Sequence, residues 1–234
     1  MRSEEEQRVR VAVVAALRVL SVGGIDDPLP NAVTVRLGDR DRFIAAPIGI
    51  PWAVVQPAEL VAGSADALRA GEVGPINIPA VNNNLDVLKR NSEIGAVFHA
   101  HAPASVLLGV LGETLVPFCQ EACRFFEAQS IVNDRFEFDD AQRPAWLAES
   151  IGRGKVLLIR NHGIMTQGAS VEEAAAWLLQ YERLADMQLR LTSRLNALPL
   201  IPDSAAHMFK KTNGSPEAGR AWFFAKLTEL QGEL

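Results

Sequence analysis

Two of the chain's four histidines, His99 and His101, lie two positions apart behind an apolar run in the segment AVFHAH. Side chains alternate between the two faces of a β-strand, so both imidazoles would project to one side, roughly 6.5–7 Å apart along the backbone. At that separation they can converge on one metal ion through metal–nitrogen bonds of about 2 Å. A third histidine, His162, ends the run VLLIRNH, and Gly163 behind it permits a sharp turn. Three neutral imidazoles with an open coordination position favour a catalytic metal site, although a histidine pair of this kind also occurs in ordinary packing.

The elements that must position these histidines are two apolar strands, predicted within residues 94–102 and 154–163. The chain begins with a predicted helix over 4–21 and a hairpin of strands 32–37 and 42–47. Pro79 and three consecutive asparagines predict a loop over 76–84, followed by a helix over 85–91. Further helices are predicted from Pro103, over 143–152, over 171–195 with Ser170 as the N-cap, and over 215–231. This pattern predicts one α/β domain over residues 1–234.

Composition narrows the class of protein. Apolar residues make up 48% of the chain, which is enough for a sizeable core. The net charge is -5 and no basic stripe is present, so a nucleic-acid partner is disfavoured. The apolar runs are shorter than the roughly 20 residues of a membrane span, and the start MRSEEEQRVR is too acidic for a signal peptide. We therefore expect a cytoplasmic protein with no membrane partner, in which Cys119 and Cys123 remain free thiols.

Three stretches of the chain resemble the class II aldolase/adducin family over about residues 33–191: HAHAPASVLLG, LVPFCQEACRFF and GKVLLIRNHGIMTQGASVEEAAAWLLQYERLADMQLRL. AVFHAH is similar to the family's VVHTH motif, and LLIRNHGIMTQGASVEEA to its LLRNHG motif. The resemblance implies a three-layer α/β/α sandwich around a mostly antiparallel sheet. It also implies one divalent metal ion held by His99, His101 and His162, and a homotetramer with sites near subunit interfaces.

The sequence departs from the aldolases of this family at positions that serve sugar-phosphate chemistry. Their phosphate-binding Ser-Ser and the acidic residue behind it match Ile78, Pro79 and Ala80 here, so two hydroxyls and a carboxylate are missing. Their Gly-Asn phosphate anchor matches Asn31-Ala32, which displaces that anchor. The single tyrosine, Tyr181, lies in the middle of a predicted helix and is a poor candidate for their general acid.

The retained histidines and the missing acids favour decarboxylation of a small hydroxylated carboxylic acid, with aromatic acids included. Retro-aldol cleavage needs a base for the departing hydroxyl proton, whereas loss of carbon dioxide needs only an acid that protonates the carbanion. A divalent cation would stabilise the enolate-like charge in either reaction. The alternatives are an aldolase for a sugar-like or sugar-phosphate substrate, a non-heme iron oxygenase and a non-catalytic, adducin-like interaction module.

The remaining candidates for the site are weaker. Glu121 is a candidate acid/base, or else a helix-start carboxylate or an interface ion pair, and His207 is a candidate general acid, or else a surface residue. The candidate substrate contacts are Asn82, Asn83, Asn84, Arg124 and Phe125. The three asparagines could instead cap the helix predicted after them. Zinc is the expected metal, and three imidazoles also accept manganese, iron or cobalt.

Overall fold

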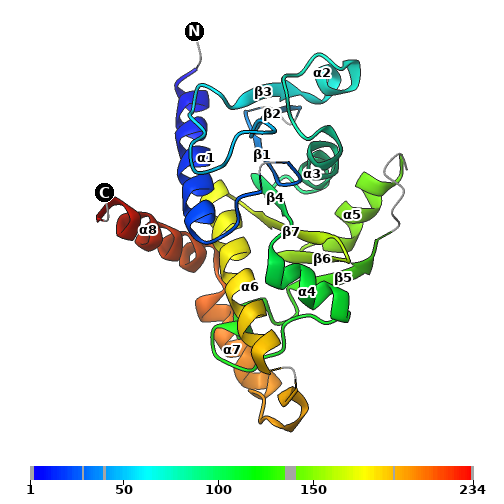
Figure 1. Cartoon of the computed structure of the whole chain (residues 1–234), viewed down its shortest axis with the longest axis vertical. Coiled ribbons are helices and arrows are strands. Elements are labelled where there is room, and N and C mark those ends of the chain that lie inside the picture. Colours follow the sequence, from blue (N-terminus) through cyan, green and yellow to red (C-terminus); the bar gives the residue numbers. More distant parts are fainter. Residues whose placement is uncertain (1–2, 28, 39–40, 135–140, 192, 233–234) are drawn as a thin grey trace.

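A computed structural model of the chain (Figure 1) describes residues 3–27, 29–38, 41–134, 141–191 and 193–232. Its strands form one seven-stranded sheet in the order β3-β2-β1-β4-β7-β6-β5. Every neighbouring pair is antiparallel except β5 and β6, which are parallel. The strand bounds are β1 Ala32–Arg36, β2 Arg42–Ala45, β3 Val61–Ser64, β4 Ala96–Ala100, β5 Gln129–Asn133, β6 Val156–Arg160 and β7 Gly163–Gly168.

Helices cover both faces of this sheet, and each layer closes its own hydrophobic core. One core joins the sheet to α1 (Glu4–Val22), α4 (Pro103–Leu111) and α6 (Val171–Leu191), and α8 (Pro216–Gly232) packs on α6. The other core joins the opposite face to α2 (Ala65–Ala70), α3 (Ile78–Arg90) and α5 (Arg143–Ile151). The predicted three-layer α/β/α sandwich with a mostly antiparallel sheet is confirmed.

The alternation of side chains along β4 decides which layer the histidine site faces. Ala96, Phe98 and Ala100 point into the core under α1, α4 and α6, whereas Val97 points into the core under α3 and α5. His99 lies two residues after Val97 and therefore faces the α3/α5 layer.

Most of the predicted elements are present. The helices over 4–21, from Pro103, over 143–152 and over 215–231 correspond to α1, α4, α5 and α8. The helix predicted over 171–195 is α6, which ends at Leu191; residue 192 lies outside the described residues, and Leu195–Ala197 form a separate 3-10 turn. Its predicted cap is present, because Ser170 Oγ accepts a hydrogen bond from the backbone N–H of Glu173 at 3.3 Å.

The loop predicted over 76–84 is wrong, because α3 begins at Ile78 and carries all three asparagines inside it. Its N-cap is Asn77, whose side chain accepts a hydrogen bond from the backbone N–H of Ala80 at 3.2 Å. Pro79 stands in the first turn, where the missing N–H costs no helical hydrogen bond. The alternative role of Asn82–Asn84 as caps is therefore excluded. The elements that were not predicted include α2, β5, β7 and α7 (Asp203–Asn213).

Candidate metal centre

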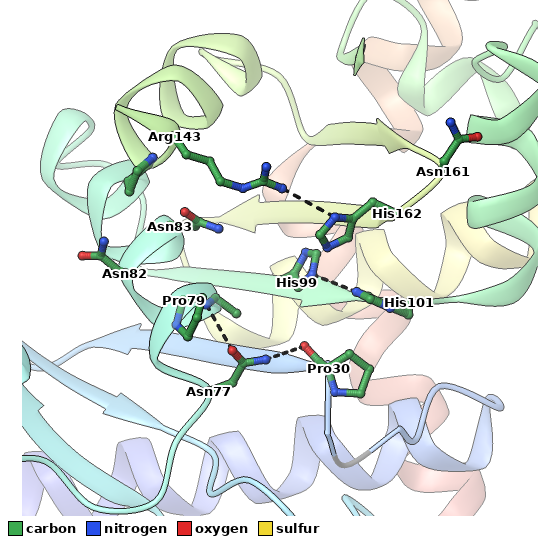
Figure 2. A pocket seen from close by; sticks show the side chains of 12 residues that line it. Pro30, Asn77, Pro79, Asn82, Asn83, His99, His101, Arg143, Asn161 and His162 are labelled. Atoms are coloured by element: carbon green, nitrogen blue, oxygen red, sulfur yellow. Dashed lines mark hydrogen bonds between the residues drawn. The ribbon is translucent and has the colours of Figure 1, made fainter. Parts of the chain in front are cut away.

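The structure brings the three predicted histidines together at one end of the central strands. His99 is on β4, His101 follows that strand directly, and His162 lies in the turn between β6 and β7 (Figure 2). The Nε2 atoms of His99 and His101 are 3.2 Å apart. One ring nitrogen from each of the three imidazoles lies within 4.8 Å of the others.

The β6–β7 turn delivers His162 to β4 through a left-handed residue on one side of it and a close backbone approach on the other. Asn161 adopts a left-handed φ of 57°, a conformation that asparagine tolerates better than most residues. A Cβ atom on Gly163 would lie 2.6 Å from the carbonyl oxygen of Ala100 and 3.3 Å from Cε1 of His99. Only glycine at position 163 therefore allows the turn to approach β4 closely enough to complete the cluster.

The surroundings of His99 and His101 favour the neutral imidazole. Burial lowers the pKa of His99 well below its usual value, and the neighbouring His162, His101 and Arg143 lower it further. Burial and then His162 also lower the pKa of His101. A neutral imidazole offers one nitrogen lone pair, which is the form that coordinates a metal ion. The donor set and its convergence therefore fit a divalent metal ion.

The histidines line a cavity of about 410 Å³. Its wall combines imidazole, guanidinium and amide groups, and none of the described lining residues carries a carboxylate. Pro79 and Ala80, which match family positions for a hydroxyl and an acid, line it as well. The full lining is Pro30, Asn77, Pro79, Ala80, Asn82, Asn83, His99, His101, Arg143, Pro144, Asn161 and His162.

Arg143 is a residue of this cavity that the sequence analysis missed. It is buried at the start of α5, and its Nη1 atom lies 2.5 Å from Asp134 Oδ1. Figure 2 shows its guanidinium directed toward His162, with Nη2 3.5 Å from Nδ1 of that imidazole. The segment QRPAWLA gives no sign of this role, because the contacts of Arg143 with Asp134, which follows β5, and with His162, in the β6–β7 turn, involve residues outside the segment.

Of the five predicted substrate contacts, two line the cavity, two lie in the core, and Arg124 lines a separate cavity. Asn82 and Asn83 line the cavity, on the first turns of α3. Asn84 does not, because it is fully buried and donates from Nδ2 to Thr34 Oγ1 at 3.2 Å and to the Val97 carbonyl at 3.4 Å. Phe125 is also fully buried, with its ring 5.0 Å from that of Tyr181. We therefore correct the assignment of Asn84 and Phe125, since both belong to the core.

The two candidate acids lie away from the histidines within one chain. Glu121 and Arg124 line a separate cavity together with Trp222. His207 is on α7, where its ring lies 5.0 Å from that of Phe126 and Nε2 lies 3.7 Å from Glu127 Oε2. Tyr181 is buried as expected, and its hydroxyl donates to Gln129 Oε1 at 2.8 Å.

The fold and the histidine cluster agree with a family comparison. The chain belongs to the Class II Aldolase and Adducin N-terminal domain family, whose model matches residues 11–189. In fold it is similar to the L-fuculose 1-phosphate aldolase from Glaciozyma antarctica PI12, with a TM-score of 0.84 at 21% identity over 98% of this chain and 92% of that one.

Two curated relatives match most of the chain. It is 26% identical over 227 residues to a 3,4-dihydroxyphthalate decarboxylase of Arthrobacter keyseri, which covers 91% of this chain and 90% of the relative. It is also 26% identical over 220 residues to a 4-hydroxy-3-prenylphenylpyruvate oxygenase/4-hydroxy-3-prenylbenzoate synthase of Streptomyces roseochromogenus subsp. oscitans, covering 91% and 78%.

Proposed function

We propose that the chain is a divalent-metal-dependent carbon–carbon lyase that decarboxylates a small hydroxylated carboxylic acid, with aromatic acids included. One observation carries this proposal. The cavity combines three imidazoles with a buried arginine, and its described lining residues include no carboxylate. The relative that acts on 3,4-dihydroxyphthalate supports the same reaction class.

The lining residues suit decarboxylation better than aldol cleavage. Cleavage of an aldol requires a base that removes the hydroxyl proton, but a guanidinium accepts no proton and an asparagine amide is neutral. The three imidazoles would be occupied as metal ligands. In decarboxylation the bond to the carboxyl carbon breaks, its electron pair stays on the substrate carbon, and carbon dioxide leaves without a proton. A bound divalent cation would polarise a substrate oxygen and stabilise the negative charge that develops next to it.

The chain's own residues would bind and orient the substrate. His99, His101 and His162 hold the ion. Arg143 presents a planar cation that pairs with carboxylates and is suited to attract and orient an acid. Asn82 and Asn83 would hydrogen-bond to substrate hydroxyls.

The finer parts of the proposal follow from the family resemblance and the donor set. We assign zinc as the ion because three imidazoles form a common zinc site, with manganese, iron and cobalt as the other candidates. A cytoplasmic homotetramer with cavities near subunit interfaces would let Glu121 or His207 of another copy donate the proton to the carbanion. In the described part of the chain, no helix is long and apolar enough to cross a bilayer.

The test is an assay of the protein loaded separately with zinc, manganese, iron and cobalt, supplied with mono- and dihydroxylated benzoates and phthalates. Carbon dioxide release without oxygen consumption, absent in His101→Ala, is the expected result. Release that requires iron and consumes oxygen would instead identify an oxygenase. Turnover of sugar-phosphate aldols alone would identify an aldolase. A protein that binds no metal and turns over no substrate would instead be the non-catalytic, adducin-like interaction module.

A further inference from the structure

We propose that Asp134 is a positioning residue of the histidine centre, which fixes the orientation and tautomer of His162, and that Arg143 holds Asp134 in place for this task. The inference rests on the metal-binding part of the proposed function and is independent of the reaction. It concerns two residues that neither the sequence motifs nor the family resemblance singled out.

The carboxylate of Asp134 contacts both His162 and Arg143. Oδ2 lies 2.5 Å from His162 Nδ1, and Oδ1 lies 2.5 Å from Arg143 Nη1. The Asp134 side chain is 0% exposed and that of Arg143 only 4%, so both contacts are shielded from water. Asp134 and His162 come together because of the order of the strands. Asp134 directly follows β5, which is the parallel neighbour of β6, and His162 lies just beyond the same end of β6.

This arrangement selects one tautomer of His162. Oδ2 of Asp134 lies within hydrogen-bond distance of Nδ1, and a carboxylate oxygen accepts a hydrogen bond from a ring N–H. Nδ1 of His162 must therefore carry the hydrogen and donate it to Asp134. In a neutral imidazole the lone pair then belongs to Nε2, the nitrogen on the other side of the ring. Nε2 thus becomes the atom of His162 that is available to a cation.

The tautomer of His162 also determines the nature of its contact with Arg143. If Nδ1 donates to Asp134, it cannot also accept from the guanidinium, so the 3.5 Å approach of Nη2 is a close packing contact. Arg143 therefore acts on His162 through Asp134. Partners of this kind behind a metal-ligating histidine typically change metal affinity about 10–100-fold when they are removed.

A spectroscopic experiment on the unaltered protein tests the tautomer directly. The ¹⁵N-labelled chain is loaded with zinc, and imidazole nitrogen shifts are assigned with the help of His162→Gln. The inference requires His162 to carry hydrogen on Nδ1 and to bind zinc through Nε2. Coordination through Nδ1, or a zinc-free Nε2 bearing the hydrogen, would overturn it.

Zinc affinity tests the positioning role without any substrate, by competition with a chromophoric chelator. Asp134→Asn keeps the size of the side chain but removes its charge, and we expect affinity to fall about 10–100-fold. Arg143→Met should weaken binding as well, and Arg143→Lys should retain more of it. Wild-type affinity in Asp134→Asn would overturn the proposal, and wild-type affinity in Arg143→Met would overturn the part assigned to Arg143.

The matched control is Glu6→Gln, which breaks another buried ion pair, that of Glu6 with Arg10 on α1. Neither residue lines the cavity, so this variant should lose stability and keep its zinc affinity. An equal loss of affinity in Glu6→Gln would mean that general destabilisation explains the effect. A protein that binds zinc in this pattern but releases no carbon dioxide would disprove the proposed reaction and leave the positioning role intact.

Discussion

The Nε2 atoms of His99 and His101 lie 3.2 Å apart, although the two residues are separated by one position on an extended segment. Side chains at such positions leave the backbone roughly 6.5–7 Å apart, so the rings must lean toward each other. The backbone N–H of His101 donates to Asn31 Oδ1 at 2.9 Å, which fixes the chain just beyond β4. The two rings are thus held in a geometry that a shared cation would stabilise.

The metal-free protein should lose stability as the pH falls below about 6.5. Burial lowers the pKa of His99 and His101 in the folded chain, whereas an unfolded histidine titrates near 6.5. Below that pH the unfolded chain binds more protons than the folded chain, so the free energy of unfolding decreases. Urea midpoints at pH 7.5 and 5.5 measure this, and the decrease should be smaller in His99→Gln. Equal decreases in both proteins would contradict the assignment to His99.

Gly163→Ala should damage both folding and metal binding. The added Cβ would lie 2.6 Å from the Ala100 carbonyl, so the β6–β7 turn must move away from β4. Overpacking of this kind costs roughly 1–3 kcal/mol of the free energy of unfolding, and the displacement of His162 should lower zinc affinity. Gly109→Ala on α4 is the control, because its Cβ would meet nothing closer than 3.7 Å. Thermal unfolding and zinc titration of both variants provide the comparison.

Neighbouring asparagines on α3 should separate substrate binding from stability. Asn83→Ala removes an amide from the cavity wall, so KM for the hydroxylated acid should rise while the free energy of unfolding stays nearly constant. Asn84→Ala removes a buried donor to Thr34 and Val97 and should cost roughly 1–3 kcal/mol of stability. A rise in KM for Asn84→Ala alone would show that the two roles are reversed.

Local pattern was sufficient to predict β4 and the apolar strand before His162, whereas the convergence of the three histidines on one metal ion was implied by the family resemblance. The alternation of side chains along β4 and the glycine after His162 are visible in a few neighbouring residues, so they can be recognised without knowing how the rest of the chain packs. The start of α3 was missed because proline and consecutive asparagines are typical of loops. In the folded chain, Asn77 caps the helix and Pro79 fits its first turn, so the same residues mark a helix start.

The Asp134–Arg143–His162 network could not be predicted, because it depends on the order of the strands. Asp134 and His162 are 28 positions apart and meet only because β5 lies parallel to β6. The resemblance also could not place Glu121 and His207, which lie away from the cavity within one chain. Long-range pairing of this kind leaves no periodic trace in the sequence.

The metal content of the purified chain, measured by elemental mass spectrometry after loading and dialysis, tests the central claim most directly. We expect about one divalent ion per chain, because three convergent imidazoles form one site, and loss of that ion in His101→Ala. No bound metal after loading with zinc, manganese, iron or cobalt, or equal metal in His101→Ala, would contradict the account.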